Sequence, residues 1–205
     1  GVRIEDNLQS ASVALLVEGL GDKRIVQTLM ADQSPRIESA LTDGTLRIEI
    51  TTGASNIAYQ FRHFYDSVCR VHVLLDADDA GRRALEALEK ENGFSHLDAT
   101  MVTAVGMNDS EVEDLLDETF LAPDILARFN VILDPAHTHP KKKFTLRMKD
   151  YFAGSGQGWT KAIEEELKTL VADAVERDPV AALRADRRGP VDALIREIES
   201  KLEAS

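Results

Sequence analysis

An alternation of two hydrophobic periods over roughly the first 120 residues constrains the fold more than any other feature. Apolar runs of strand length are followed each time by a segment whose apolar residues recur at helical spacing. These runs occupy residues 13–19, 45–53, 70–78 and 99–106. Strands that alternate with helices of about ten residues imply right-handed crossovers. We therefore expect an α/β fold whose mainly parallel, four-stranded sheet is flanked by helices and binds ligands beyond the carboxyl ends of its strands.

The strand pattern fades after about residue 120, and most of the second half is predicted to be helical. Residues 131–134 have the composition of one further strand, and 135–143 form a turn-rich break. Pro179 and Pro190 are placed at or near helix starts. The simplest plan is an α/β domain over residues 1–120, followed by a mostly helical region over 121–205.

The negative charge of the chain lies entirely in its first part. The net charge is −12, and residues 1–118 carry 10 Lys/Arg against 22 Asp/Glu, whereas residues 119–205 carry 14 of each. An acidic surface repels nucleic acid, so a nucleic-acid function requires metal ions or a local basic patch.

Nothing in the composition indicates export or a membrane. Cys69 is the single cysteine and cannot form an intrachain disulfide. No apolar run approaches the roughly 18 to 20 residues of a spanning helix, and the first ten residues do not resemble a secretory signal. We expect a cytoplasmic protein with no membrane association.

Acidic residues stand at the carboxyl ends of the predicted strands or directly after them. Glu18 closes the first strand, Asp76 and Asp78 close the third, and Glu113 with Asp114 follows the fourth. Parallel strands bring these ends to one edge of the sheet, where carboxylates repel one another unless a cation neutralises them. Hard oxygen ligands of this kind suit Mg²⁺ or Mn²⁺.

Each acidic residue taken alone has a simpler explanation. An Asp-x-Asp pair between a strand and a helix is common, and Asp79 is expected to cap a helix that begins at Ala80. Ser110 or Asp109 is expected to cap a helix that runs to about residue 120. Glu113 by itself would be a solvated helix residue. The ordered combination on different strand ends favours a metal site.

Three segments in this order resemble the Toprim domain shared by topoisomerases, bacterial primases and several nucleases. They are "LLVEGLGDKRIV", "VLLDADDAGRRA" and "SEVEDLL", and the resemblance covers roughly residues 10–118. Glu18 matches the strand-end glutamate of that family, and Asp76 and Asp78 match its Asp-x-Asp pair. Asp22, one helical turn after Glu18, and the acidic pair after the fourth strand are similar to the OLD (overcoming lysogenization defect) family of ATP-dependent nucleases.

The resemblance implies a DNA endonuclease or nickase that uses two divalent ions, Mg²⁺ or Mn²⁺. Asp76 is expected to bridge the ions, with Glu18 and Asp22 on one, and with Asp78 and Glu113, joined by Glu111 as a further candidate, on the other. The helical region over residues 121–205 is expected to complete the active site and the DNA surface. In the OLD family the Toprim domain follows an ABC-type ATPase. No Walker A pattern occurs here, so we expect the nuclease half, with the ATPase domain missing from this chain and a helicase as a further partner of the full system.

Basic residues in the second half are candidates for contact with the substrate. OLD-like sequences carry a lysine after a glycine-rich turn, and "GSGQGWTKA" resembles that arrangement, so Lys161 joins Glu18 and Asp76 as an expected catalytic residue. It would lie in the first turn of a long helix, where phosphate is favoured. The alternative is a solvated lysine after a flexible turn. A DNA-backbone surface is expected at Lys141, Lys142, Lys143 and Arg147, with a solvated helix face as the alternative.

Several other function classes fit the sequence less well. A receiver-like domain would need an acidic pair after the first strand, and an Asp-x-Asp phosphatase would carry that pair on the first strand. A primase-like, topoisomerase-like or RNA-processing Toprim protein remains possible, as does a Toprim-like nucleic-acid-binding module without catalysis. Such modules usually lose some of the acids, and this chain retains all of them.

Overall fold

The computed structural model describes residues 11–67 and 69–204, and within them four strands form one sheet. The strands are β1 (Val13–Val17), β2 (Leu46–Ile50), β3 (Arg70–Asp76) and β4 (Ala99–Val102). Their order is β2-β1-β3-β4 and every neighbouring pair is parallel. The predicted α/β class and parallel sheet are confirmed.

The register of the strands brings the acidic strand ends together. Val17 of β1 pairs with Ile50 of β2, and Asp76 of β3 pairs with Val102 of β4. Since all four strands run the same way, Glu18 and Asp76 emerge at the same edge of the sheet.

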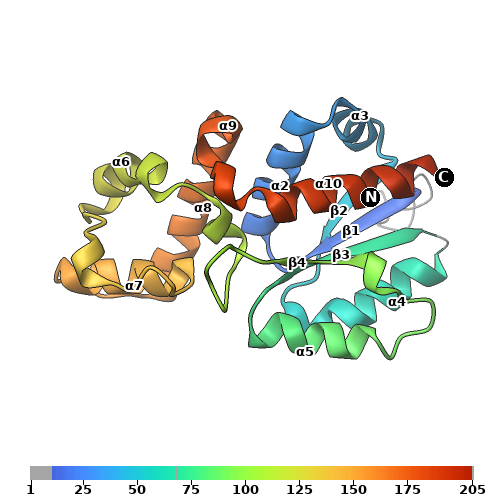
Figure 1. The fold of residues 1–205 in the computed structure, drawn as a ribbon, viewed down its shortest axis with the longest axis horizontal. Helices are drawn as coiled ribbons and strands as arrows, with labels where there is room; N and C mark the ends of the chain where they lie inside the picture. Colours follow the sequence, from blue (N-terminus) through green and yellow to red (C-terminus); the bar gives the residue numbers. More distant parts are fainter. Residues whose placement is uncertain (1–10, 68, 205) are drawn as a thin grey trace, which may run out of the picture.

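Helices cover both faces of the sheet (Figure 1). On one face lie α2 (Leu20–Gln33), α3 (Pro35–Asp43) and the last helix, α10 (Gly189–Glu203), and on the other lie α4 (Ile57–Asp66) and α5 (Asp79–Leu88). Alternate residues of β1 supply the two cores, because successive side chains of a strand point to opposite faces. Leu15 packs in the core with Ile198 of α10, and Leu16 packs in the other with Phe61 of α4.

The remaining helices form a lobe beside the sheet, to the left in Figure 1. They are α6 (Glu118–Phe129), α7 (Phe144–Gly154), α8 (Lys161–Arg177) and α9 (Pro179–Ala182). In the lobe, the ring of Phe152 lies 5.4 Å from that of Phe129 and 5.1 Å from that of Trp159, measured between centroids. Because α8 packs against α2, the lobe is held against the acidic edge of the sheet.

The second half does not have a separate core. The boundary predicted at residue 120 falls inside α6, and the larger hydrophobic cluster joins Ile25 of α2 to Val171 of α8 and Ile198 of α10. Five short 3₁₀ turns complete the described elements. They are η1 (Ala54–Asn56), η2 (His96–Asp98), η3 (Val112–Leu115), η4 (Pro135–His137) and η5 (Ala185–Arg187).

Two local predictions after β4 are wrong. The helix expected from residue 110 is the turn η3, because Ser110 is bound to Ala77 by two backbone hydrogen bonds and donates its hydroxyl to the carbonyl of Val102. The helix α6 begins later, capped by Asp117. Residues 131–134 are not a strand, since they follow α6 in the helical lobe and no ladder of the described sheet reaches them.

The start of α5 also differs from its prediction. Asp78, and not Asp79, is the N-cap, and its Oδ1 accepts hydrogen bonds from the backbone N–H groups of Ala80 and Gly81. Asp79 is the first helical residue and pairs with Arg82. Pro179 and Pro190 stand at helix starts as predicted.

Among the described helices, none combines the length and the apolar composition that crossing a membrane requires.

Candidate active site at the carboxyl edge of the sheet

Three acidic side chains gather where β1 and β3 end. Glu18 follows β1, Asp22 lies in the first turn of α2, and Asp76 is the last residue of β3. The backbone N–H of Gly19 donates to Asp22 Oδ2 at 2.9 Å, which fixes the Asp22 carboxylate beside the strand end. Burial raises the pKa of Glu18, and the nearby carboxylates of Asp22 and Asp78 raise it further. The mutual repulsion expected from the sequence is therefore present.

Asp76 lies at the centre of this group. Burial raises its pKa well above the ordinary value, and the next largest causes are Asp22, Glu113 and Glu18. A carboxyl group surrounded by other carboxyl groups in this way is costly to ionise unless positive charge is brought to it.

Glu113 carries the least satisfied carboxylate of the site. It lies in η3 with 1% of its surface exposed, and neither of its side-chain oxygens has a hydrogen-bond partner in the described structure. Glu18 Oε1 is likewise buried without a partner in the described residues. Burial and then Glu111 raise the pKa of Glu113 to about 8. Buried polar oxygens without hydrogen-bond partners are uncommon in folded proteins, and a bound water or cation is one explanation for them.

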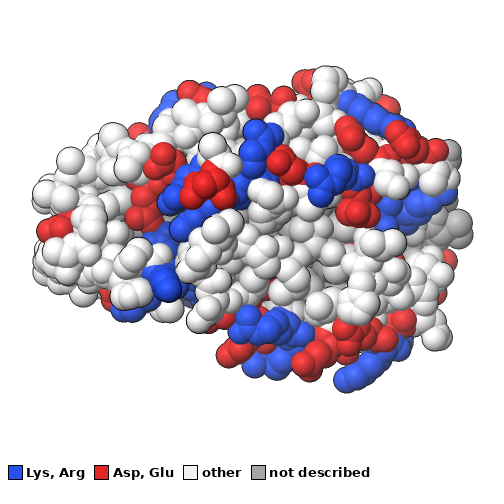
Figure 2. Space-filling view, viewed as in Figure 1, with Lys and Arg blue, Asp and Glu red and all other residues white. Residues whose placement is uncertain are grey.

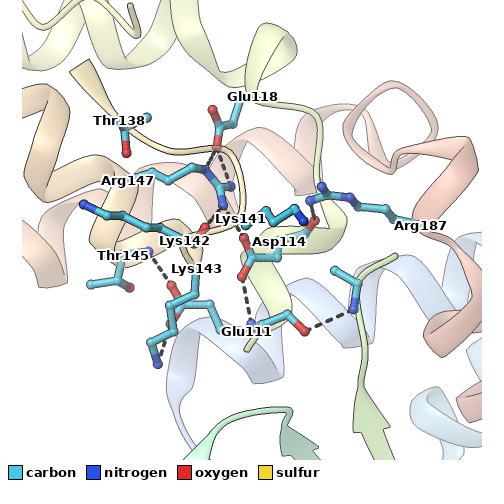
Figure 3. A network of polar contacts seen from close by, with 12 residues as sticks. Glu111, Asp114, Glu118, Thr138, Lys141, Lys142, Lys143, Thr145, Arg147 and Arg187 are labelled. Carbon is cyan, nitrogen blue, oxygen red and sulfur yellow. Dashed lines mark hydrogen bonds and ion pairs between the residues drawn. The ribbon is translucent and has the colours of Figure 1, made fainter. Parts of the chain in front are cut away.

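Two lysines supply positive charge to this edge. Lys143 Nζ lies 2.7 Å from Asp78 Oδ2 and 3.3 Å from Glu111 Oε2, and Figure 3 shows it alongside Glu111. Burial works against the charge of Lys143, but these two carboxylates raise its pKa. Lys168 Nζ, from the middle of α8, lies 3.9 Å from Glu113 Oε1. Glu113 raises the pKa of Lys168 in spite of burial, so both lysines stay protonated at neutral pH.

Asp78 and Glu111, two of the predicted metal ligands, have structural partners of their own. Burial alone would raise the pKa of Asp78, but Lys143 and the N–H groups at the start of α5 lower it below the ordinary value. Glu111 Oε1 accepts the backbone N–H of Thr145 in the first turn of α7. These two carboxylates thus already accept hydrogen bonds, unlike Glu18 Oε1 and the two side-chain oxygens of Glu113.

The structure does not bring Lys161 into this cluster. It begins α8 as predicted, but its side chain is 90% exposed and pairs with Glu165 at 3.6 Å. Lys168 lies seven positions further along the same helix, which corresponds to about 10 Å. Sequence reasoning missed Lys168, and its position in a helical pattern gives no signal, since most helix lysines are solvated.

The predicted DNA-binding residues divide into three kinds. Lys141 and Lys142 are exposed, and Lys142 pairs with Asp150 at 2.7 Å. Lys143 faces the acidic cluster. Arg147 is only 5% exposed and pairs with Asp114 and Glu118. On the face seen in Figure 2, basic and acidic side chains are interspersed, so a broad basic surface is absent from that face.

The carboxylates of the edge are not arranged as a ready set of metal ligands. In residues 11–67 and 69–204, no three His, Cys, Asp or Glu side chains stand together in positions to hold one metal ion. The chemistry nevertheless fits a hard divalent cation, because Glu18 Oε1 and both Glu113 side-chain oxygens are buried carboxylate oxygens without hydrogen-bond partners in the described structure. These carboxylates match a divalent cation in donor type and in charge. Their side chains would have to rotate before several of them could bind the same ion.

Comparisons of the chain with protein-family models, with curated proteins and with solved structures find no match. The fold itself is a four-stranded, all-parallel sheet flanked by helices, with a largely helical second half.

Proposed function

We propose that this chain is a metal-dependent phosphodiesterase that cuts or nicks DNA. The observation that carries the proposal is a group of three buried glutamate oxygens at the sheet edge, Glu18 Oε1 and both side-chain oxygens of Glu113, which lack hydrogen-bond partners in the described structure. The order of the acids along the strands is that of a Toprim domain, and Asp22 with the acidic pair after β4 is most similar to the nuclease half of the OLD family.

Charge at the site favours additional cations. Six carboxylates influence one another there, and the two lysines that face them are Lys143 and Lys168. The six are Glu18, Asp22, Asp76, Asp78, Glu111 and Glu113. Carboxylate oxygen donors in excess of the available positive charge suit Mg²⁺ or Mn²⁺.

The residues that would hold the ions follow from their positions. Asp76 would hold the ions together with Asp22, Glu113 and Glu18, the three carboxylates that most oppose its ionisation. Bound divalent ions would supply an acidified water and neutralise charge on the phosphate. Asp78 and Glu111 would join the ion shell only if Lys143 moved away from them.

The protein's own contribution would be to position charge. Lys143 and Lys168 approach the acidic cluster from the start of α7 and from α8, so a phosphate bound over the cluster would meet a lysine from each helix. Preorganised cations of this kind stabilise the charge that develops on a transferring phosphoryl group. On this geometry Lys143 and Lys168 are better placed than Lys161. The ATPase domain, the helicase partner and the cytoplasmic location expected from the resemblance belong to the same proposal.

Nicking of supercoiled plasmid in Mg²⁺ or Mn²⁺ tests the function. The wild-type chain should convert supercoiled to open-circular DNA, and EDTA or the Asp76→Asn variant should abolish the conversion. Asp79→Asn is the matched control, because Asp79 is exposed and pairs with Arg82. Cleavage that survives EDTA, or that Asp76→Asn leaves unchanged, would contradict the proposal.

A nucleic-acid-binding module without catalysis is the second candidate. It is favoured by the ion pairs of Lys143 and by the lack of a ready three-ligand set among the described side chains. Titration calorimetry with Mn²⁺ distinguishes the two functions. DNA binding without Mn²⁺ binding or cleavage would favour the module.

A further inference from the structure

Arg147, one of the residues predicted to contact DNA, is buried and donates hydrogen bonds to three groups. Its Nη1 donates to Asp114 Oδ1 at 2.8 Å and to the backbone carbonyl of Lys142, and its Nε donates to Glu118 Oε1 at 2.5 Å. Figure 3 shows the guanidinium between these groups. It therefore connects α7 to the segment before α7, to η3 and to the start of α6.

The partner of Arg147 continues the connection towards the acidic cluster. Asp114 Oδ2 accepts the backbone N–H of Glu111 at 2.9 Å, and the Glu111 side chain accepts the backbone N–H of Thr145. Glu111 Oε2 also lies 3.3 Å from Lys143 Nζ. The contacts form a closed path from Arg147 through Asp114 and Glu111 back to α7.

Lys143 lies inside this path. It is the residue before the first turn of α7, in extended backbone conformation and without a side-chain cap of its own. Arg147 holds the carbonyl on one side of Lys143, and Glu111 holds the amide of Thr145 on the other. Fixing the ammonium group of a lysine costs side-chain conformational entropy. When the backbone around Lys143 is already held in place, only this side-chain entropy is lost on forming the contact.

We infer that Arg147 is a positioning residue, which holds residues 142–145 against η3 so that the Lys143 ammonium group lies at Asp78 and Glu111, and that it makes no contact with DNA. The effect of Arg147 on the nicking rate rests on the proposed nuclease function, whereas its effect on the conformation of residues 142–145 does not. An arginine suits this role because its rigid fork reaches several acceptors at once, which a lysine cannot do.

The test uses Arg147→Met, Arg147→Lys and the double variant Arg147→Met/Asp114→Asn. The double variant avoids a buried, unpaired Asp114 carboxylate and keeps an oxygen for the Glu111 N–H, so it guards against simple unfolding. The control is Lys141→Met, since Lys141 is exposed. Three quantities are measured: DNA affinity in EDTA, the single-turnover nicking rate at saturating DNA with Mn²⁺, and amide hydrogen exchange over residues 141–147.

A positioning role predicts that all three Arg147 variants bind DNA within about twofold of wild type but nick it about 10- to 100-fold more slowly, as displaced catalytic groups do. The Thr145 amide should exchange faster in each of them, while amides of the β-sheet keep their protection. Lys141→Met, the comparison variant at an exposed predicted DNA contact, should instead weaken DNA binding and lower its salt dependence, and should leave the exchange of the Thr145 amide as in wild type.

Three results would overturn the inference. Weaker DNA binding with a normal saturating rate in Arg147→Met would make Arg147 a DNA contact. Full recovery of rate in the double variant would mean that Arg147 serves only to neutralise Asp114. If the wild-type chain does not nick DNA, the nuclease proposal fails by itself, and the exchange of Thr145 still decides the positioning role: unchanged protection in the double variant would overturn it.

Discussion

Lys143 Nζ lies 2.7 Å from Asp78 Oδ2, although the two residues are 65 positions apart in the chain. The same Asp78 carboxylate caps α5 through its other oxygen. One side chain thus fixes a helix start next to β3 and a lysine from the helical lobe. This contact joins the two halves of the chain at the point where chemistry is proposed.

Lys143→Met should reduce the saturating nicking rate by about 10²- to 10³-fold, the usual loss when one preorganised charge is removed from a reacting phosphate or oxyanion. Binding of Mn²⁺ should be retained, since the acids remain. Single-turnover assays and calorimetry measure the two quantities. The neighbouring Lys142→Met is the control, because Lys142 pairs with Asp150 away from the cluster. Equal losses in both variants would argue against a specific role for Lys143.

Lys168→Met should strengthen Mn²⁺ binding. The Lys168 ammonium group lies 3.9 Å from Glu113 and competes with an incoming cation for that carboxylate. Removing it should tighten the dissociation constant by about tenfold, or roughly 1.4 kcal/mol. Titration calorimetry is the measurement, and Lys161→Met should leave the constant unchanged because Lys161 is exposed, about two helical turns away. Weaker Mn²⁺ binding in Lys168→Met would contradict the prediction.

Gly81→Ala should destabilise the protein and impair the site. A Cβ at this position would lie 1.9 Å from the backbone oxygen of Asp76, so α5 or the end of β3 must shift. Alanine has the better helix propensity by about 1 kcal/mol, yet forced overpacking costs about 1 to 3 kcal/mol and should prevail. Urea unfolding measures the change. Gly158→Ala, with nothing within 4 Å of its added Cβ, should stay within about 0.5 kcal/mol of wild type.

The metal-free protein should lose stability between about pH 6.5 and pH 8. Folding raises the pKa of Glu113 to about 8, so in this range the folded state holds a proton that the unfolded chain releases, and rising pH favours unfolding. The slope for one such group is at most about 1.4 kcal/mol per pH unit. Below about pH 6.5 the buried His72 acts in the opposite sense, because burial lowers its pKa to about 3 and protonation then favours the unfolded chain.

Urea titrations in EDTA at several pH values measure this dependence. Glu113→Gln, which cannot titrate, should flatten the slope over the same range. A wild-type stability that rises there would show that Glu113 does not carry a raised pKa in the folded protein.

The sheet and the acids at its edge could be predicted from the residue pattern alone. Hydrophobic periodicity is a local property, since alternate residues of a strand such as Leu15 and Leu16 must face opposite cores whatever packs on them. Parallel strands then carry Glu18 and Asp76 to one edge without any further information. Helix starts with proline, as at Pro179, follow from equally local geometry.

Local capping was less predictable. Asp78 and Asp79 are both suitable N-cap residues, and the choice depends on which of them leaves the strand in extended backbone conformation. Ser110 had the sequence of a cap, but its bridge to Ala77 outweighs a helix start there.

Which basic residues face the acids depends on long-range packing and could not be predicted. Lys143, Lys161 and Lys168 all lie in or beside helices of mixed charge, and a helical pattern does not distinguish a lysine that faces a packed neighbour from one in water. The distinction arises from the packing of α8 on α2 and from the path of contacts through Arg147. These contacts join residues far apart in the chain, and their energies depend on burial, which no short segment of sequence contains.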